Sequence, residues 1–402
     1  MTTPSYPQLH IKRGKEHAVS KGHPWIFAGA IHTDVPIEQY GAIFDIHVPD
    51  GNKFIARGYF NGHSQIAFRA LTRDQNEAID QRFFEKKFRE LFELRKRFIN
   101  TRSTNAFRCV FGESDGIPGL IIDKYNDVFV IQIHTMGMEL LRKTIVEAMK
   151  EVYNPKTIYE RSDVGVRKHE NLPDEPKGHV WGERLTGEVE ILEHNVKFLV
   201  NVVDGQKTGF FLDQRDNRKA LQSYCTGKRV LNCFSYTGGF SVYAALAGAT
   251  ETISVDVAAA ALETAKRNFE INKLPTNKHQ FIDMDVFNYI DQCEKKGEKF
   301  DVIILDPPAF VKNKASLKKG LAGYLYINER ALHLLPKGGI LVSSSCSAHV
   351  SDEMLQQTLS MAAARAHCTL KAVEIRHQPI DHPFNVQFIE GKYLKYYVMV
   401  KE

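Results

Sequence analysis

The feature that most constrains the fold is a regular alternation of short apolar runs with longer amphipathic segments, which begins near residue 196. The apolar runs are "RVLNCF", "ETISVDV", "HQFIDMD", "FDVIILD" and "ILVSSS", and segments such as "AAALETAKRNFEINK" and "YINERALHLLPKGG" separate them. Strands that alternate with helices favour a doubly wound, mainly parallel sheet. Because ligands of such sheets bind beyond the carboxyl ends of the strands, the residues that end these runs are the first candidates for a functional site.

The residues before this region follow a different pattern. Residues 9–73 contain brief apolar runs between turn residues, which predicts a small β-barrel. "IDQRFFEKKFRELFELRKRFI" predicts an amphipathic helix, and "FRCVFGESDGIPGLIIDKYNDVFVIQIHT" predicts a β-meander. Residues 168–190 are rich in glycine, proline and charge, and we interpret them as a link. The predicted domains are a β-barrel at 1–75, a central α+β domain at 76–190 and the alternating α/β domain at 191–402.

The chain of 402 residues contains no uninterrupted run of about 18 apolar residues, so a membrane span is not expected. The first residues, "MTTPSYPQLHIKRG", lack the apolar core of a signal peptide. The cysteines are scattered, none forms a C-x-x-C pair, and no compact Cys/His cluster predicts a metal site. A reduced, cytoplasmic protein without a structural metal fits these observations.

The positive charge is concentrated on the N-terminal side. Residues 1–110 contain 17 Lys and Arg against 11 Asp and Glu, whereas the other 292 residues contain 36 and 37. A basic surplus in one region fits an acidic partner such as nucleic acid. A mildly basic, solvated surface is the alternative that charge alone leaves open.

A glycine-containing turn follows the first strand of the alternating region. In "RVLNCFSYTGGFSVYAA" the strand enters this turn at Thr237 and Gly238, where the backbone can approach a ligand closely. Asp256 ends the next strand, 18 residues beyond Gly238, and a carboxylate there can accept hydrogen bonds from both ribose hydroxyls. Asp285 and Val286 end the third strand, where an adenine ring could lie. Generic α/β turns with a solvated Asp256 are the alternative.

This order of residues resembles class I S-adenosylmethionine-dependent methyltransferases. The resemblance implies a Rossmann-like domain with S-adenosyl-L-methionine as its cofactor. The turn departs from the usual D/E-x-G-x-G-x-G, because Asn232 stands at the acidic position and Tyr236 where the middle glycine often lies. A nicotinamide enzyme is disfavoured because G-x-G-x-x-G is absent. The residues expected to bind the cofactor are Asn232, Phe234, Tyr236, Thr237, Gly238, Asp256, Asp285, Val286 and Asp306.

The fourth strand ends in "DPPAF", whose prolines cannot donate ladder hydrogen bonds, so the strand must stop there. The stiff turn would hold Asp306 beside a planar base, with Phe310 available for stacking. The stretch resembles the D/N-P-P-Y/F motif of nucleobase methyltransferases, and lysines in the following loop could meet phosphates. The alternative is an ordinary turn with solvated lysines. The expected substrate-binding residues are Pro307, Pro308, Phe310, Lys312 and Lys314.

Cys346 follows the fifth strand, in "ILVSSSCSAHV". An exocyclic amine can be methylated directly, but carbon 5 of cytosine is a poor nucleophile, so a thiolate must first add to carbon 6. The ends of "ILVSSS" and "VIILD" are neighbours in a parallel sheet, which places Cys346 near Asp306. Asp306 could bond to N3 of the ring and offset the electron density gained on addition. A buried, inert thiol is the alternative.

Several stretches together are similar to one family. They are "GESDGIPGLIIDKY", "ERSD", "DGQKTGFFLDQRDNR", "NCFSYTGGF", "DPPAF" and "SSSCS", and they resemble the ribosomal RNA large-subunit methyltransferase I family of 23S rRNA (cytosine-5)-methyltransferases. The resemblance covers nearly the whole chain and implies an N-terminal PUA domain that binds RNA. It also implies that Phe211, Gln214 and Arg215 frame the cofactor or active-site pocket, for which domain packing is the alternative.

The sequence therefore predicts an RNA cytosine-5 methyltransferase that acts on 23S ribosomal RNA or a ribosome assembly intermediate. Cys346 is the expected nucleophile and Asp306 the residue that positions the base. One rival function methylates an exocyclic amine or a guanine in RNA, and another is that of a non-catalytic, RNA-binding assembly factor. The target nucleotide and the oligomeric state stay open at this point, with a homodimer among the options.

Overall fold

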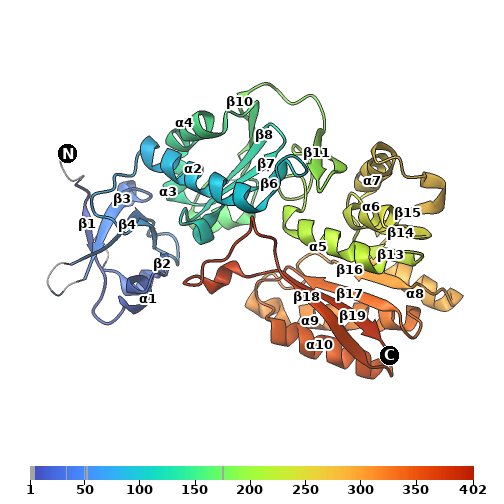
Figure 1. Cartoon of the computed structure of the whole chain (residues 1–402). Coiled ribbons are helices and arrows are strands. Elements are labelled where there is room, and N and C mark those ends of the chain that lie inside the picture. Colours follow the sequence, from blue (N-terminus) through green and yellow to red (C-terminus); the bar gives the residue numbers. More distant parts are fainter. Residues whose placement is uncertain (1–4, 33, 49, 51–52, 174–175) are drawn as a thin grey trace. The chain divides into compact units, whose positions relative to one another are not determined.

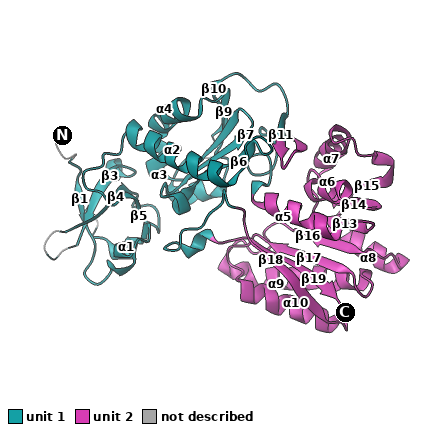
Figure 2. Ribbon diagram, in the orientation of Figure 1, with its two compact units in different colours: residues 1–191, 200–212, 380–391 teal, residues 192–199, 213–379, 392–402 magenta. Residues whose placement is uncertain are grey.

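The structure is a computed structural model, and it describes residues 5–32, 34–48, 50, 53–173 and 176–402 (Figure 1). The chain forms two compact units (Figure 2). Unit 1 contains residues 1–191, 200–212 and 380–391, and unit 2 contains residues 192–199, 213–379 and 392–402. Because these segments alternate, the chain passes between the units several times.

The N-terminal part of unit 1 forms, within its described residues, a five-stranded sheet in the order β1-β3-β4-β5-β2. The elements are β1 (Gln8–His10), α1 (His17–Ser20), β2 (Trp25–Ile26), β3 (Ile43–His47), β4 (Phe54–Phe60) and β5 (Phe68–Thr72). Just past the edge strands, Ile11 and Ile31 form an antiparallel bridge, and the His32 N–H donates to the His10 carbonyl at 3.1 Å. These contacts bring the two edges together around a buried apolar core, as the predicted barrel requires.

A second sheet in the described part of unit 1 has five strands in the order β10-β9-β8-β7-β6. The strands are β6 (Ala106–Phe111), β7 (Leu120–Tyr125), β8 (Val128–Ile133), β9 (Thr157–Arg161) and β10 (Lys177–Gly182). β6, β7 and β8 pair in sequence as an antiparallel meander, which confirms the prediction. The helices are α2 (Gln81–Phe98), α3 (Met136–Leu140) and α4 (Arg142–Tyr153). Phe88 of α2, Met149 of α4 and Ile122 of β7 belong to one buried core.

The interpretation of residues 168–190 as a link is wrong for part of this segment. β10 lies within it and pairs antiparallel with β9. β10 is an edge strand of the sheet, and none of its residues is buried. It therefore lacks the buried apolar run by which a strand is recognised in a sequence.

Unit 2, all of whose residues are described, contains a seven-stranded sheet in the order β15-β14-β13-β16-β17-β19-β18 (Figure 1). The strands are β13 (Arg229–Cys233), β14 (Glu251–Asp256), β15 (His279–Asp283), β16 (Val302–Leu305), β17 (Ile340–Ser345), β18 (Leu370–Arg376) and β19 (Lys395–Lys401). β13 to β17 run parallel, β19 pairs antiparallel with β17, and β18 pairs antiparallel with β19. The strand order reverses between β13 and β16, which is the point where doubly wound sheets bind ligands. The predicted α/β architecture is confirmed.

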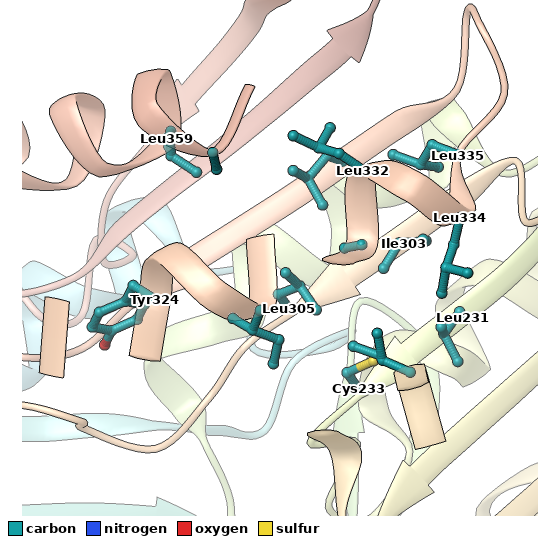
Figure 3. Close-up of a cluster of buried hydrophobic side chains, with 14 of the residues drawn as sticks. Leu231, Cys233, Ile303, Leu305, Tyr324, Leu332, Leu334, Leu335 and Leu359 are labelled. Atoms are coloured by element: carbon teal, nitrogen blue, oxygen red, sulfur yellow. The ribbon is translucent and has the colours of Figure 1, made fainter. Parts of the chain in front are cut away.

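Side chains of the parallel strands alternate between two cores, because successive strand residues point to opposite faces. On β13, Leu231 and Cys233 face one core and Val230 faces the other. Figure 3 shows the first core, in which Leu231 and Cys233 lie with leucines of the covering helices. The helices of unit 2 are α5 (Arg215–Leu221), α6 (Gly239–Leu246), α7 (Ala259–Ile271), α8 (Val286–Lys296), α9 (Leu317–Leu334) and α10 (Asp352–Arg365). The core in Figure 3 is covered by α8, α9 and α10, and the opposite core by α5 and α6.

A hairpin of β11 (Val189–Glu193) and β12 (Val196–Val200) lies where the chain first passes between the units in sequence. Glu193 of this hairpin forms a buried ion pair with Arg218 of α5, with 2.6 Å between the carboxylate and guanidinium atoms. Removal of either partner would leave a buried, uncompensated charge. Across the described ranges, every helix is too short or too polar to traverse a lipid bilayer.

Candidate functional site

The turn after β13 has an unusual backbone. Phe234, Tyr236 and Gly238 adopt φ angles of 59°, 48° and 75°, which lie in the left-handed region. Residues other than glycine rarely adopt this conformation, and such strain is concentrated at functional sites. Tyr236 thus takes the conformation of the glycine that this sequence lacks. Turns that alternate in this way can form backbone concavities for anionic groups.

Asp256, at the carboxyl end of β14, holds this turn. Its Oδ2 atom accepts a hydrogen bond from the Tyr236 N–H at 2.8 Å, and its Oδ1 atom accepts one from the Ala258 N–H at 2.9 Å. Asn268 of α7 supports the same turn by donating from its side chain to the Thr237 carbonyl at 2.9 Å. Each carboxylate oxygen has a second lone pair, so Asp256 can still accept hydrogen bonds from a ligand.

Three buried polar atoms around the turn have no hydrogen-bond partner among the described residues. They are Asn232 Oδ1, Ser235 Oγ and Thr237 Oγ1. The Asn232 amide nitrogen donates to Ser241 Oγ at 2.9 Å. Within the described residues, the unpaired atom of this side chain is therefore its amide oxygen. Buried polar atoms are nearly always satisfied. The cluster therefore fits a polar ligand that exchanges hydrogen bonds with the turn.

The predicted residues after β15 lie where the chain enters α8. Asp285 is exposed and caps the helix, because its Oδ1 atom accepts a hydrogen bond from the Asn288 N–H at 3.1 Å. Val286 packs its side chain in the core, so only its backbone can face a ligand. Val257, which follows Asp256, is 66% exposed and offers apolar surface beside this carboxylate. The sequence prediction omits Val257, although an apolar residue directly after a strand-end carboxylate is a readable signal.

Gln214 joins the ends of two neighbouring strands. Its Nε2 atom donates to Asp306 Oδ1, after β16, at 2.9 Å and to Ser344 Oγ, in β17, at 3.1 Å. Its Oε1 atom accepts a hydrogen bond from Asn217 Nδ2 at 2.7 Å. The buried amide therefore fixes the Asp306 carboxylate relative to the strand that leads to Cys346.

Arg215 and Phe211 are placed differently from Gln214. Arg215 begins α5, is buried and donates from Nε to Asp216 Oδ1 at 3.0 Å. Phe211 belongs to unit 1, where the Lys207 ammonium lies 4.4 Å from the centre of its ring. The pocket roles of Phe211 and Arg215 stay predictions.

The turn after β16 packs on aromatic residues. The Phe310 ring centre lies 4.8 Å from that of Tyr324, 6.1 Å from that of Phe287 and 6.2 Å from that of Phe234. Gly320 of α9 permits this packing, because a Cβ atom there would lie 2.9 Å from the Phe310 carbonyl oxygen. Phe310 is half-buried, so it is held firmly while part of the side chain stays accessible.

A hollow of about 400 Å³ opens beside this turn. Its lining residues are Phe287, Phe310, Lys312, Asn313, Ser316, Lys319, Gly320 and Gly323. Aromatic rings supply apolar surface, and the lysines supply positive charge. Lys314 is also exposed, in the single turn before α9, whereas Pro307 is buried and Pro308 exposed.

Serine side chains on both sides of Cys346 hold its segment in place through hydrogen bonds. Ser345 Oγ donates to the Tyr324 hydroxyl at 2.9 Å, and Ser347 Oγ accepts a hydrogen bond from the Val311 N–H at 3.3 Å. The Tyr324 and Ser347 hydroxyls lie 3.2 Å apart. These bonds tie the neighbours of Cys346 to α9 and to the turn after β16. The sequence prediction misses them because it assigns the serines only to the end of a strand.

Cys346 and Asp306 follow adjacent parallel strands, whose register pairs Leu305 with Ser343. Both predicted catalytic residues therefore lie at the same edge of the sheet. The Cys346 side chain is half-buried. Burial raises the pKa of each of the other five thiols, that of Cys225 to about 12, which reduces the fraction present as the nucleophilic thiolate. These cysteines are Cys109, Cys225, Cys233, Cys293 and Cys368, and burial is the largest influence on each of their pKa values.

A second hollow, of about 430 Å³, lies in the N-terminal barrel of unit 1. Its lining residues are Lys15, Ala18, Val19, His23, Trp25, Ile26, Phe27, Gly29 and Ala30. Phe27 is 55% exposed, so an accessible aromatic ring and a lysine share this surface. Aromatic rings next to positive charge suit the bases and phosphates of a single-stranded nucleic acid.

Comparisons with known proteins agree with this arrangement. Residues 135–392 match the model of the S-adenosylmethionine-dependent methyltransferase family, and residues 9–73 match that of the PUA-like domain. Ribosomal RNA large subunit methyltransferase I of Aeromonas salmonicida is 42% identical over 387 residues, which are 96% of this chain and 97% of that protein. The protein of the same name from Klebsiella pneumoniae is 40% identical over 395 residues, or 98% of each chain.

A solved structure shares the architecture over its whole length. SMU.776, a provisionally assigned methyltransferase that was crystallised with SAH, matches with a TM-score of 0.85 and 26% identity. The match covers 98% of this chain and 100% of that chain. The predicted cofactor, S-adenosylmethionine, is thereby confirmed. The chain belongs to the S-adenosylmethionine-dependent methyltransferases and, among them, to the ribosomal RNA large subunit methyltransferase I family.

Proposed function

We propose that this protein methylates carbon 5 of a cytosine in 23S ribosomal RNA through a covalent bond between Cys346 and carbon 6 of the base. The observation that carries the proposal is the half-buried Cys346 thiol at the end of β17, next to the strand end that bears Asp306. The name of the relatives, ribosomal RNA large subunit methyltransferase I, supports a ribosomal RNA substrate. The PUA-like domain at residues 9–73 and its hollow support RNA binding.

Carbon 5 of cytosine needs activation before it can take a methyl group. In the proposed reaction the Cys346 thiolate adds to carbon 6, and the electron pair of the C5–C6 double bond moves toward carbon 5 and N3. When bound, S-adenosylmethionine supplies an electrophilic methyl group to carbon 5 and departs as a neutral thioether. A base then removes the carbon-5 proton, the double bond re-forms and Cys346 leaves as a thiolate.

The turn after β16 would position the cytosine. Asp306, held by Gln214, would donate a proton from its carboxylic-acid form to N3, which offsets the electron density gained there, and would take that proton back when the C5–C6 double bond re-forms. A cytosine inside a helix would have to be flipped to reach Cys346. The proposed contacts to the base and its flanking phosphates are Pro307, Pro308, Phe310, Lys312 and Lys314.

The cofactor would lie at the carboxyl ends of β13, β14 and β15. The unpaired oxygens of Asn232 and Thr237 fit the amino and carboxylate groups of its methionine part. Asp256 would accept hydrogen bonds from the ribose hydroxyls. The adenine would lie against exposed Val257 and near Asp285, which is also exposed.

We expect Asp256→Ala to weaken S-adenosylmethionine binding roughly 100-fold, because two hydrogen bonds to a charged acceptor are lost. The change also releases the Tyr236 N–H, which loosens the turn that receives the methionine part. Calorimetric titration of the protein with the cofactor measures the dissociation constant.

Glu251→Ala is the matched control, because Glu251 begins the strand that Asp256 ends and therefore lies at the opposite edge of the sheet. Its dissociation constant should stay within about threefold of the wild-type value. Unchanged cofactor affinity in Asp256→Ala would show that the ribose lies elsewhere.

The ribosomal RNA itself distinguishes this function from its two rivals. In cells that lack the protein, mass mapping of 23S ribosomal RNA should show the loss of a 5-methylcytosine, which returns when the gene is restored. A lost methyl group on an exocyclic amine or a guanine would support the first rival. Unaltered methylation together with failure to bind S-adenosylmethionine would support the second, a non-catalytic assembly factor.

A further inference from the structure

Lys395 is a buried lysine that no step of the proposed reaction uses. It begins β19 and is 4% exposed. Its Nζ atom donates to the Ser347 carbonyl at 2.8 Å and to the Val350 carbonyl at 2.6 Å. Buried lysines are rare because removing an ammonium from water is costly. This position therefore calls for a role that an apolar residue could not fill.

The two carbonyls belong to the segment that follows β17 and carries Cys346. The antiparallel register pairs Lys395 with Ser345, the residue directly before Cys346. The ammonium thus holds the chain on the far side of Cys346, at Ser347 and Val350, while the strand pairing holds the near side. Together with the serine hydroxyls, this arrangement leaves the segment little freedom to move.

The charge of Lys395 is not cancelled by a direct ion pair in the described chain. The carboxylate with the largest electrostatic effect on Lys395 is Asp352, at the start of α10. Its Oδ2 atom lies 3.1 Å from Lys392 Nζ, and its Oδ1 atom accepts a hydrogen bond from the Tyr397 hydroxyl. Burial lowers the pKa of Lys395 to about 8. The charges of Asp352 and Cys346 raise this pKa, and the charge of Lys392 lowers it further. At neutral pH the group is therefore mostly an ammonium, and it lies on the strand that pairs with the one leading to Cys346.

We propose that Lys395 is a positioning residue for the nucleophile, which holds the Cys346 segment in place and stabilises the thiolate with its positive charge. This proposal rests on the role of Cys346 in the proposed function. An ammonium has three N–H donors, and the two carbonyls occupy two of them. The third is available to face a thiolate. A nearby cation lowers the pKa of a thiol and so raises the fraction present as the nucleophilic thiolate.

Titration of Cys346 in the whole protein, without RNA or cofactor, tests the proposal. The rate of alkylation of Cys346 by iodoacetamide, followed by mass spectrometry of its tryptic peptide between pH 6 and 10, reports the thiolate fraction. In the wild-type protein we expect the thiol to titrate below its ordinary pKa of about 8.5. In Lys395→Met the midpoint should rise by about one pH unit, and the methylation rate at pH 7 should fall roughly tenfold.

Lys401→Met is a matched control from the same strand. Lys401 also donates from Nζ to two carbonyls, those of Leu332 at 2.7 Å and Leu335 at 2.8 Å, but these lie at the end of α9. Its loss should cost similar stability and leave the Cys346 titration unchanged. A purely structural role for Lys395 would reduce stability in both variants without moving the thiol midpoint.

The titration also separates this proposal from the proposed function. If the titration midpoint of Cys346 in the wild-type protein lies above about pH 8.5, the proposed role of Lys395 is wrong. This result does not depend on whether Lys395→Met folds. If Lys395→Met is unstable, Lys395→Gln removes the charge while keeping a donor, and an unchanged midpoint in that variant likewise overturns it. Methylation by a Cys346→Ala variant would instead overturn the proposed function, and the titration would still decide whether Lys395 stabilises the thiolate.

Discussion

In the Cys346→Ala variant we expect methyl transfer to ribosomal RNA to fall by at least about 10,000-fold, because loss of the nucleophile removes the covalent route. Cofactor affinity should change little, since the residues proposed to hold S-adenosylmethionine follow other strands. Transfer of a labelled methyl group to 23S ribosomal RNA measures the first quantity, and calorimetry measures the second.

Cys368→Ala is the matched control for loss of a thiol. Cys368 is half-buried like Cys346 but lies before β18, away from the carboxyl ends of β16 and β17. This variant should methylate at the wild-type rate. RNA that contains 5-fluorocytosine should trap a denaturation-resistant complex with the wild-type protein, because fluorine replaces the proton that must leave before Cys346 is released. Full methylation by Cys346→Ala would contradict the covalent mechanism and favour direct transfer of the methyl group to an exocyclic amine.

Most of the parallel part of the large sheet is predictable, because four of its five strands are buried apolar runs. β13, β14, β16 and β17 have this character, and the residues that end them form the candidate site. β10 and β18 are not predictable in the same way. Both are edge strands with partly exposed residues, so neither contains a buried apolar run. The resemblance to a known family predicts features that local sequence patterns do not identify, such as the PUA-like domain.

The identity of the site residues is predictable, but the contacts that orient them are not. Asp256, Asp306 and Cys346 stand out because each ends or directly follows a strand in a doubly wound pattern. Their supports come from distant segments, as Gln214 does for Asp306. Lys395 is the extreme case, because nothing in "GKYLKYYVMV" distinguishes Lys395 from a solvated lysine at the start of a strand. Only antiparallel pairing with β17 buries that lysine beside the Cys346 segment.

Asp306→Asn is expected to lower kcat about 100-fold while the dissociation constant of S-adenosylmethionine rises less than tenfold. Asparagine has nearly the same shape and keeps an oxygen that can accept the hydrogen bond from Gln214 Nε2. An amide cannot supply or take a proton at N3, so the electron density that builds up on the base after addition of Cys346 is no longer offset. Single-turnover methylation gives the rate, and calorimetry gives the affinity.

Asp301→Asn supplies the control at the opposite end of the same strand. The Asp301 carboxylate accepts a hydrogen bond from the Arg229 N–H at 2.9 Å, just before β16 begins. The same change of charge there should leave kcat near the wild-type value, since ligands of a doubly wound sheet bind at the carboxyl ends of its strands. If Asp306→Asn instead lost cofactor affinity and kept its kcat, Asp306 would be a cofactor residue alone. The negative charge that develops on N3 would then have to be offset by another group at the carboxyl ends of β16 and β17.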